Sequence, residues 1–425
     1  MTGGGMMATF LALMVSGLPV AMAMAGAALI YVMLSGNLPD FVVIHRMYGG
    51  VDSFPLLAVP FFIWAGNLMN SAGITNRIYN FALALVGWMK GGLGHVNVVG
   101  SMIFAGMSGT AIADAAGLGT VEIKAMKDHG YSTEFAVGVT AASATVGPII
   151  PPSLPFVIYG MMAGVSIGQL FLAGVIPGIL MGAVMMLTVA YYAHTRKYEA
   201  DARFSWRVLG KTFIEAFLAM MTPVLLVGGM TMGVFTPTEG AIAASMWALF
   251  LGLAWYRTLG WRTLIKLTMD TIETTAVVLF IVAAASIFGW LLTVTRVTEE
   301  IALWLLSFTQ NPAVFLLLAN LLLLFVGCFL EPVAAITLLV PILIPICQKL
   351  GIDLVHFGLV MVLNLMIGLL HPPMGTVLFV LSRVARLSFE RTTIAILPWL
   401  VPLLGTLFLC TYVPEIVLWL PKRFF

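Results

Sequence analysis

The sequence predicts an all-α, polytopic membrane protein built from two inverted repeats, each with a re-entrant helical hairpin and a broken transmembrane helix. Hydrophobic residues make up 61% of the 425 positions and charged residues only 9%, whereas soluble chains carry about 25% charged residues. Apolar stretches of about 20 residues, enough to cross a bilayer core of roughly 30 Å, recur along the chain. Glycines and prolines in two of these stretches repeat at a constant offset. Lipid offers the backbone no hydrogen-bond partner, so the spanning elements are helices.

Hydropathy predicts nine membrane spans along the chain. They cover residues 7–34, 54–71, 131–164, 168–194, 215–235, 240–257, 272–294, 354–381 and 393–421. No basic residue precedes the first apolar run, so we expect 7–34 to be a retained span and not a cleaved signal peptide.

Two further apolar segments do not behave as single spans. Residues 96–122 are interrupted around Gly106, and residues 312–349 are interrupted around Gly327 and Pro332. Glycine and proline weaken or end a helix, so each segment is predicted to enter the membrane and return to the side from which it came.

The distribution of charge predicts the sidedness of the chain. Basic residues gather within 196–211, 257–266 and 383–391, and the positive-inside rule places all three clusters in the cytoplasm. Nine spans that start from a cytoplasmic amino terminus satisfy this assignment and put the carboxyl terminus in the periplasm. Basic flanks place the opening of the first hairpin in the cytoplasm, and acidic flanks place that of the second hairpin outside. The predicted location is the inner membrane.

Charge and cysteine content exclude several classes of protein. A net charge of only +2 gives no indication of nucleic-acid binding. Cys328, Cys347 and Cys410 lie in apolar runs without metal-ligand spacing, and three cysteines cannot complete a disulfide framework. We find no nucleophile and base constellation and no phosphate loop, so an enzyme is not expected.

An internal repeat is indicated by a fixed offset of 221 residues, from Gly106 to Gly327. The same offset brings several glycines and prolines into register: Gly130 with Gly351, Gly147 with Gly368, and Pro151-Pro152 with Pro372-Pro373. It also lays span 54–71 over 275–292 and span 168–194 over 389–415. Chance recurrence explains any one pair but not the whole set.

The repeat predicts three parts of the chain: a first repeat over 1–200, a basic loop with a connecting span over 201–238, and a second repeat over 239–425. Each repeat has an even number of crossings, so the extra span 215–235 inverts the second copy. Inverted repeats with broken helices are typical of secondary transporters, because two equivalent halves can exchange outward and inward states.

Each repeat contains a span with a helix-breaking proline pair, Gly147-Pro-Ile-Ile-Pro-Pro-Ser153 and Gly368-Leu-Leu-His-Pro-Pro-Met374. Proline removes a donor and obstructs the carbonyl one turn earlier, which leaves backbone carbonyls free in a medium without water. Such carbonyls, with the hydroxyls of Ser108 and Thr110 at a hairpin tip, suit Na⁺, and half-helix amino termini attract an anionic substrate. The alternative is a proline kink packed against neighbouring helices, with hydroxyls bonded to the preceding turn.

Ionisable residues at membrane depth are costly unless they are paired or hydrated. Asp114 follows the first tip and either hydrogen-bonds a polar substrate or complements a helix dipole. Glu331 either caps the helix that follows it or ligates a cation. Arg296 either meets a substrate carboxylate or pairs with Glu299 at the interface, and Glu122 is interpreted as structural.

Two short segments, residues 77–90 and 299–310, are amphipathic and too short to span. This pattern predicts helices that lie in the membrane interface and brace a fixed scaffold.

At these motifs the sequence resembles the large membrane subunit of tripartite ATP-independent periplasmic (TRAP) transporters, over essentially the whole chain. The most specific parts are Asp52-Ser-Phe-Pro-Leu-Leu-Ala58, Ser108-Gly-Thr110, the 147–153 segment and Asn364-Leu-Met-Ile-Gly-Leu-Leu-His-Pro-Pro373. The resemblance implies an elevator-type fold of the ion-transporter superfamily and Na⁺-driven uptake of a small organic anion. It also implies delivery by a separate periplasmic binding protein and a small four-helix membrane partner subunit.

The resemblance further implies two sodium sites. The residues of the first sodium site are Ser108, Thr110, Gly147 and Ile149, and those of the second are Cys328, Glu331 and Gly368. Substrate is expected at Asp114, Thr110, Ser153 and Arg296. This chain has His371 where family members commonly have Thr. The segment around Asp114 resembles the sialic-acid and sugar-acid branch more than the C4-dicarboxylate branch.

Two other functions remain open from the sequence. One is a sodium-coupled divalent-anion symporter that works without a binding protein, and the other is a channel or scaffold subunit. Uptake that requires the binding protein would distinguish a TRAP transporter from the symporter. Uptake that depends on a sodium gradient would distinguish it from a channel or scaffold subunit.

Overall fold

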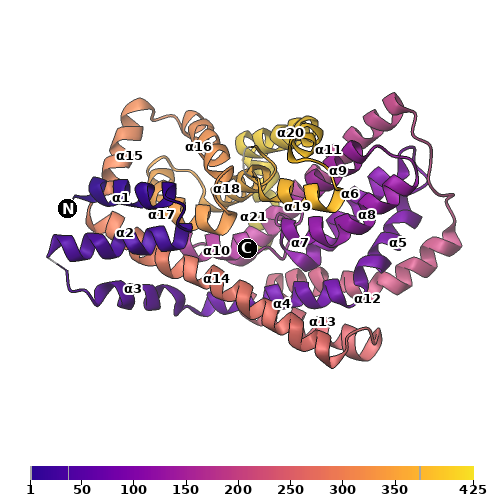
Figure 1. The fold of residues 1–425 in the computed structure, drawn as a ribbon, viewed down its shortest axis with the longest axis horizontal. Helices are drawn as coiled ribbons and strands as arrows, with labels where there is room; N and C mark the ends of the chain where they lie inside the picture. The colour runs from indigo at the N-terminus through magenta and orange to yellow at the C-terminus, as the bar shows by residue number, and fades with distance from the viewer. Residues whose placement is uncertain (1, 37, 373–374) are drawn as a thin grey trace.

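The computed structural model describes residues 2–36, 38–372 and 375–425, apart from the side chains of Met107 and Ser108. Within these residues the chain is a succession of helices joined by short turns (Figure 1). Seven of the described helices are long and apolar enough to cross a membrane: Phe54–Ser71, Ile167–Arg196, Trp206–Thr231, Pro237–Trp255, Trp261–Val294, Pro332–Lys349 and Phe389–Tyr412.

The first half of the chain contains the predicted first hairpin and first broken helix. Its helices are α1 Gly3–Val15, α2 Val20–Ser35, α3 Val42–Val51, the 3₁₀-helix η1 Phe54–Leu57, α4 Ala58–Ser71, α5 Ile74–Val86, α6 Gly92–Ser108, α7 Ala111–Ala116, α8 Leu118–Asp128, α9 Thr133–Ala144, α10 Leu154–Ala163 and α11 Ile167–Arg196. Helices α6 to α8 form the hairpin, and α9 and α10 are the two parts of the broken helix.

The second half contains the predicted second hairpin and second broken helix. Its helices are α12 Trp206–Thr231, α13 Pro237–Phe250, the π-helical turn η2 Leu251–Trp255, α14 Trp261–Val294, α15 Val297–Phe308, α16 Pro312–Gly327, α17 Pro332–Lys349, α18 Leu354–Gly368, α19 Thr376–Ala385, α20 Phe389–Tyr412 and α21 Pro414–Phe424. Helices α16 and α17 form the second hairpin, and α18 and α19 are the two parts of the second broken helix.

Helix boundaries recur at the offset found in the sequence. Helix α7 begins at Ala111 and α17 at Pro332, which is 221 residues later, and the same offset separates the starts of α9 and α18. Gly130 and Gly351, also matched by this offset, both adopt a positive φ, of 81° and 68°. The segments predicted to lie in the interface are the helices α5 and α15. The inversion of one half relative to the other stays a prediction.

The predicted single span 7–34 is wrong, because this segment forms the two helices α1 and α2, which pack side by side (Figure 1). Gly17 turns the chain with φ +94°, and Pro19, which has no N–H to donate, precedes α2. Two crossings in place of one would move the amino terminus to the opposite face. Its cytoplasmic assignment therefore no longer follows from the span count.

The predicted span 393–421 is also wrong as a single helix. Helix α20 ends at Tyr412, and Val413 leaves the helical region with φ −121° and ψ 78° before Pro414 starts α21. Proline disfavours the helical conformation of the residue before it, which explains the break. Helix α21 then packs against α11 and α18.

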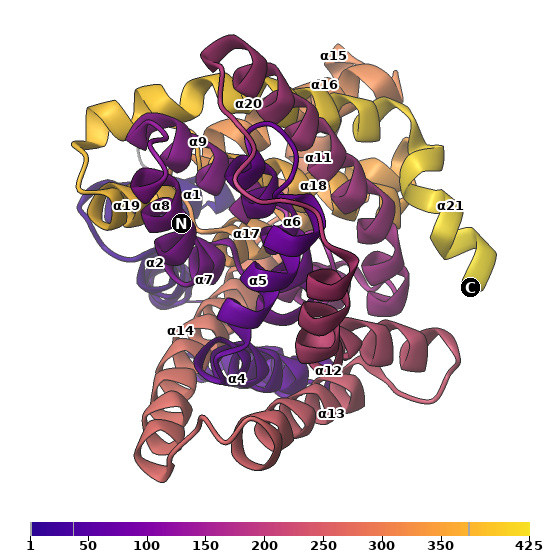
Figure 2. The same cartoon turned by 90° about the vertical axis from the view of Figure 1, so that its right-hand side faces the viewer.

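The helices form two groups that are visible from both directions (Figures 1 and 2). Helix α14 runs along one side, and α2, α3 and α4 pack against it, while α13 packs against α4; we call these five helices the α14 layer. Helices α9, α11, α18 and α20 pack together as the central bundle. One helix of each hairpin, α6 and α17, contacts both the layer and the bundle.

The segment that joins α11 to α12 runs beside the segment that joins α5 to α6. The carbonyl of Gly87 accepts hydrogen bonds from the N–H groups of Asp201 and Ala202, at 3.1 and 3.0 Å. The Asp201 carboxylate accepts from the Leu93 N–H at 2.8 Å and from the hydroxyl of Tyr131. We call this pairing the linker contact.

Candidate functional site

The tip of the first hairpin touches the break in the first broken helix. Gly109, between α6 and α7, adopts φ +61°, and a Cβ atom placed on it would lie 2.7 Å from the carbonyl oxygen of Pro152. A Cβ atom on Gly147 would lie 3.7 Å from the carbonyl oxygen of Thr110. The structure therefore brings two of the predicted sodium-site residues, Thr110 and Gly147, into backbone contact.

Two predicted hydroxyl ligands are amino-terminal caps of half-helices. The Thr110 hydroxyl oxygen accepts from the N–H of Ala113 at 3.3 Å in α7. The Ser153 hydroxyl oxygen accepts from the N–H of Phe156 at 3.4 Å in α10, and the same hydroxyl donates to the Pro148 carbonyl. The backward bonding that the sequence left as an alternative is thus present at Ser153, whereas the Thr110 hydroxyl bonds to the turn that follows it. A capping oxygen keeps a second lone pair, which can still face a cation.

The other predicted residues of the first sodium site lie differently. The carbonyl of Ile149 faces α11, because a Cβ atom on Gly174 would come 2.0 Å from this oxygen. Only glycine permits this approach of α11 to the break. The side chain of Ser108 lies outside the described residues, so its predicted role stays a prediction.

At the second tip the backbones of the hairpin and the broken helix meet directly. A Cβ atom on Gly368 would lie 2.8 Å from both Cα and C of Gly327. The Cys328 sulfur lies 3.1 Å from Nδ1 of His371. The structure therefore joins Cys328 and Gly368, both predicted for the second sodium site, in one contact region.

Glu331 is the cap of α17. Its carboxylate accepts from the N–H groups of Val333 and Ala334, at 3.1 and 3.4 Å, which confirms the capping interpretation. Glu331 lies 221 residues after Thr110, and both residues cap the returning helix of their hairpin. The Glu331 side chain is also exposed, so a cation can still reach it.

The two halves cross at the tips. Helix α7 of the first hairpin packs against α19, the second part of the other half's broken helix. Helix α17 of the second hairpin packs against α10 in the same way. Each returning hairpin helix thus contacts the broken helix of the other half, and the amino-terminal ends of short helices gather in the middle of the molecule.

Asp114 lies on α7, within this crossing. Its side chain is 2% exposed, and its Oδ2 atom has no hydrogen-bond partner in the part of the chain that the structure describes. A buried carboxylate oxygen without a donor is costly unless something else satisfies it. Asp114 is therefore placed where a polar ligand would relieve that cost.

Arg296 is not brought to this region. It adopts φ 57° at the junction of α14 and α15, and its side chain is exposed. This junction lies at the end of the molecule away from α7 (Figure 1). The structure joins Thr110, Ser153 and Asp114 through the first tip and break but leaves Arg296 apart from them.

A buried polar network links the first hairpin to α9, and reasoning from the sequence missed it. The side chain of Asn97 donates to Glu122 and to Thr140, both at 2.7 Å, and accepts from Ser143 at 2.6 Å. Ser101 donates to Ser143 at 3.1 Å. The polar residues lie four apart on α6 and three apart on α9, the spacing of one helical face, which is the signal that could have revealed them.

The second half has a counterpart. Asn364, which lies 221 residues after Ser143, donates to the side-chain and backbone oxygens of Asn320 at 2.8 and 3.0 Å. Asn320 in turn donates to Thr411 at 3.0 Å. In each half, hydrogen bonds thus fix the entering helix of the hairpin to the first part of the broken helix.

The described residues contain no group of three His, Cys, Asp or Glu side chains placed to hold a metal. A cation at the tips would therefore be held mainly by hydroxyl and carbonyl oxygens. Thr110, Ser153 and the segments around Gly147 and Gly368 supply oxygens of that kind.

Solved structures share this arrangement of helices. The structure of MtrF from Neisseria gonorrhoeae, described as illuminating a class of antimetabolite efflux pumps, aligns with a TM-score of 0.62. It covers 95% of both chains at 11% identity, which shows a common fold and nothing about substrate. The predicted all-helical, polytopic fold class is confirmed.

Sequence relatives identify the family. Residues 7–416 match the family described as "Tripartite ATP-independent periplasmic transporter, DctM component". The chain is 47% identical to the sialic acid TRAP transporter large permease protein SiaM of Vibrio cholerae, over 98% of this chain and 97% of that protein. It is 40% identical to the sialic acid TRAP transporter permease protein SiaT of Haemophilus influenzae, over 97% and 67%. These relatives are named as permeases and not as enzymes. The chain belongs to the tripartite ATP-independent periplasmic transporter family, as a large permease subunit.

Proposed function

We propose that this permease subunit drives the uptake of a small organic acid across the bacterial inner membrane, using a sodium gradient. The observation that carries the proposal is the crossing at the tips, where each returning hairpin helix contacts the broken helix of the other half. Such a meeting of half-helices supplies carbonyl oxygens for a cation and helix amino termini for an anion in one place.

The sodium sites are proposed at the two contacts between tip and break. The first uses the oxygen of Thr110 and the backbone near Gly147, with Ser108 and Ile149 as further candidates. The second uses the region of Cys328, Glu331 and Gly368. Support comes from the close backbone approaches at both places, which leave carbonyl groups beside short helix ends.

The substrate is proposed to bind beside Asp114, Thr110 and Ser153, between the two tips. A sialic acid or sugar acid fits this proposal better than a C4-dicarboxylate, in line with the names of SiaM and SiaT. The capped starts of α7 and α10 direct partial positive charge toward an acid group. Arg296 remains a candidate for the substrate path, at a point where it is exposed.

An elevator movement is proposed between the α14 layer and the bodies that carry the tips. Glycine faces proline at one point where the two meet: a Cβ atom on Gly289 of α14 would lie 3.2 Å from Pro341 of α17. This contact involves no long side chain, so α17 can shift along α14 there without unlocking interdigitated side chains. It supports a moving body against a fixed layer.

Two partners are proposed: a periplasmic binding protein that delivers the substrate, and a small four-helix membrane subunit. The word "tripartite" in the family description supports an assembly of three components. The multi-pass chain itself supplies the membrane path.

Uptake by proteoliposomes tests the proposal. Labelled organic acids are offered with and without an inward sodium gradient, and with and without the binding protein, after reconstitution with the small subunit. We expect accumulation only when both the gradient and the binding protein are present. Accumulation without the binding protein would favour the symporter alternative, and equilibration without dependence on sodium would favour a channel.

A further inference from the structure

We propose that a basic groove at the start of α12 binds the headgroup of an anionic phospholipid. The groove has a volume of about 470 Å³ and lies between α5, the segment before α12 and the first turns of α12. Its lining includes Asn80, Leu83, Arg203, Arg207 and Lys211. The proposal needs only the membrane location of the chain and does not depend on sodium coupling.

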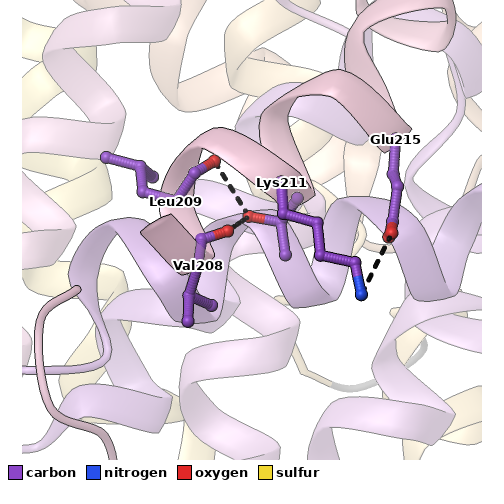
Figure 3. A network of polar contacts seen from close by, with 5 residues as sticks. Val208, Leu209, Lys211 and Glu215 are labelled. Atoms are coloured by element: carbon purple, nitrogen blue, oxygen red, sulfur yellow. Dashed lines mark hydrogen bonds and ion pairs between the residues drawn. The ribbon is translucent and has the colours of Figure 1, made fainter. Parts of the chain in front are cut away.

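Charge is the first argument for an anionic ligand. Arg203, Arg207 and Lys211 line the groove together with one carboxylate, that of Glu215. Lys211 lies 4.0 Å from Glu215 along the surface of α12, and both side chains are largely exposed, at 78% and 45% (Figure 3). An exposed pair of this kind is weak, so Lys211 can turn to another anion, and the two arginines keep the groove positive.

The side chains that carry the positive charge are suited to bind a phosphate group. A guanidinium presents a planar fork of donors that matches two phosphate oxygens, and two arginines flank the groove four residues apart. Thr212, which also lines the groove, donates its hydroxyl to the carbonyls of Val208 and Leu209, at 3.0 and 3.2 Å (Figure 3). The hydroxyl oxygen therefore stays available as an acceptor for the glycerol or other hydroxyl groups of a headgroup.

The position of the groove selects a lipid over a free anion. Below it, α12 is the least buried of the seven candidate spans in the described residues, with 28% of its apolar window covered by the rest of the molecule. Val224 and Leu225, which follow the last lining residue of α12 by more than two turns, are 57% and 51% exposed and would face acyl chains. Trp206 is 77% exposed at the start of the helix, as is typical of an aromatic residue at the membrane surface.

The predicted sidedness of the same basic residues agrees with an anionic lipid. The groove contains part of the largest basic cluster, which the positive-inside rule places on the cytoplasmic face. Anionic lipids give that face a negative surface potential, and basic pockets between membrane helices there bind anionic headgroups. Charge, shape and position thus agree on one occupant.

Native mass spectrometry of the full chain in neutral detergent tests the proposal. The chain is titrated with phosphatidylglycerol, with phosphatidylcholine of the same acyl chains, and with glycerol phosphate alone. The test variant is Arg203→Gln with Arg207→Gln. The matched control is Arg262→Gln with Lys266→Gln, which removes two positive charges at the start of α14, outside the groove.

We expect the unaltered chain to bind phosphatidylglycerol about tenfold more tightly than phosphatidylcholine, since each basic residue near the headgroup adds of the order of a kilocalorie per mole. The test variant loses this preference, and the control variant keeps it. Glycerol phosphate competes weakly, because it has no acyl chains to contact α12.

Several results would overturn the proposal. Equal binding of the two lipids, or an equal loss in the control variant, would show that no specific headgroup site exists. Strong competition by glycerol phosphate would indicate a soluble phosphate site. Displacement of the lipid by the purified small membrane subunit would indicate a protein surface. Should the double variant fail to fold, as judged by circular dichroism, Arg207→Gln alone carries the same test.

Discussion

Gly368→Ala tests the contact between the second hairpin and its broken helix. The added methyl group would lie 2.8 Å from Cα and C of Gly327, where ordinary van der Waals contacts lie at 3.4–4 Å. These atoms belong to the backbone and cannot rotate away, so α16 and α18 must separate. The substitution therefore acts at the proposed second sodium site without removing any side-chain ligand.

The expected magnitude follows from two opposing terms. Overpacking of a well-packed region costs about 1–3 kcal/mol. Alanine in place of a helical glycine returns about 0.5–1 kcal/mol. We therefore expect Gly368→Ala to lower the free energy of unfolding by about 1–2 kcal/mol. Gly327→Ala should cost less, because its methyl group would lie 3.3 Å from Gly368.

Thermal unfolding in detergent, with and without sodium chloride, measures the stability of each variant and its stabilisation by sodium. Potassium chloride controls for ionic strength. Gly405→Ala in α20 is the matched control, since a methyl group there meets nothing within 4 Å. We expect Gly368→Ala to lower the unfolding midpoint and to reduce the stabilisation by sodium, while Gly405→Ala does neither. If Gly368→Ala were as stable as the unaltered chain, the backbone contact at this tip would not be tight.

Three further predictions concern the tips and their supports. Thr110→Val should cost about 1 kcal/mol of stability by removing a helix cap, and it should raise the sodium concentration for half-maximal uptake, whereas Thr110→Ser keeps both; identical sodium curves would contradict this. Asn364→Leu should lower the free energy of unfolding in detergent by about 1–3 kcal/mol, because Asn320 loses its donor; an unchanged midpoint would contradict the network. Asp114→Ala and Arg296→Ala should each weaken uptake without loss of membrane insertion, and normal uptake by both would remove them from the substrate path.

The broken helices and hairpins were predictable because their physical cause is local. A proline obstructs the helical carbonyl four residues before it, and α9 stops at Ala144, four residues before Pro148, as α18 stops at Gly368, four residues before Pro372. The repeat offset was predictable as well, since glycines that turn the chain must occupy the same place in both copies. Gly130 and Gly351 do so with the same positive φ.

The remaining features depend on tertiary contacts that no local pattern reports. The apolar run 7–34 has span length, and only the turn at Gly17 and Pro19 divides it into two packed helices. The hydrogen-bond partners of Asn97 and Asn364 lie on other helices, so these bonds become visible only once the helices are packed together. The distance of Arg296 from the tips likewise depends on the full length of α14.

The linker contact limits how the parts of this protein can shift. Two connecting segments are involved: one joins α5 to α6 and the other joins α11 to α12. Hydrogen bonds at Gly87 and Asp201 hold the two segments together. Two connections that are bonded to each other cannot move apart without breaking these bonds. In the proposed elevator movement, the two connections would therefore have to shift together as one unit.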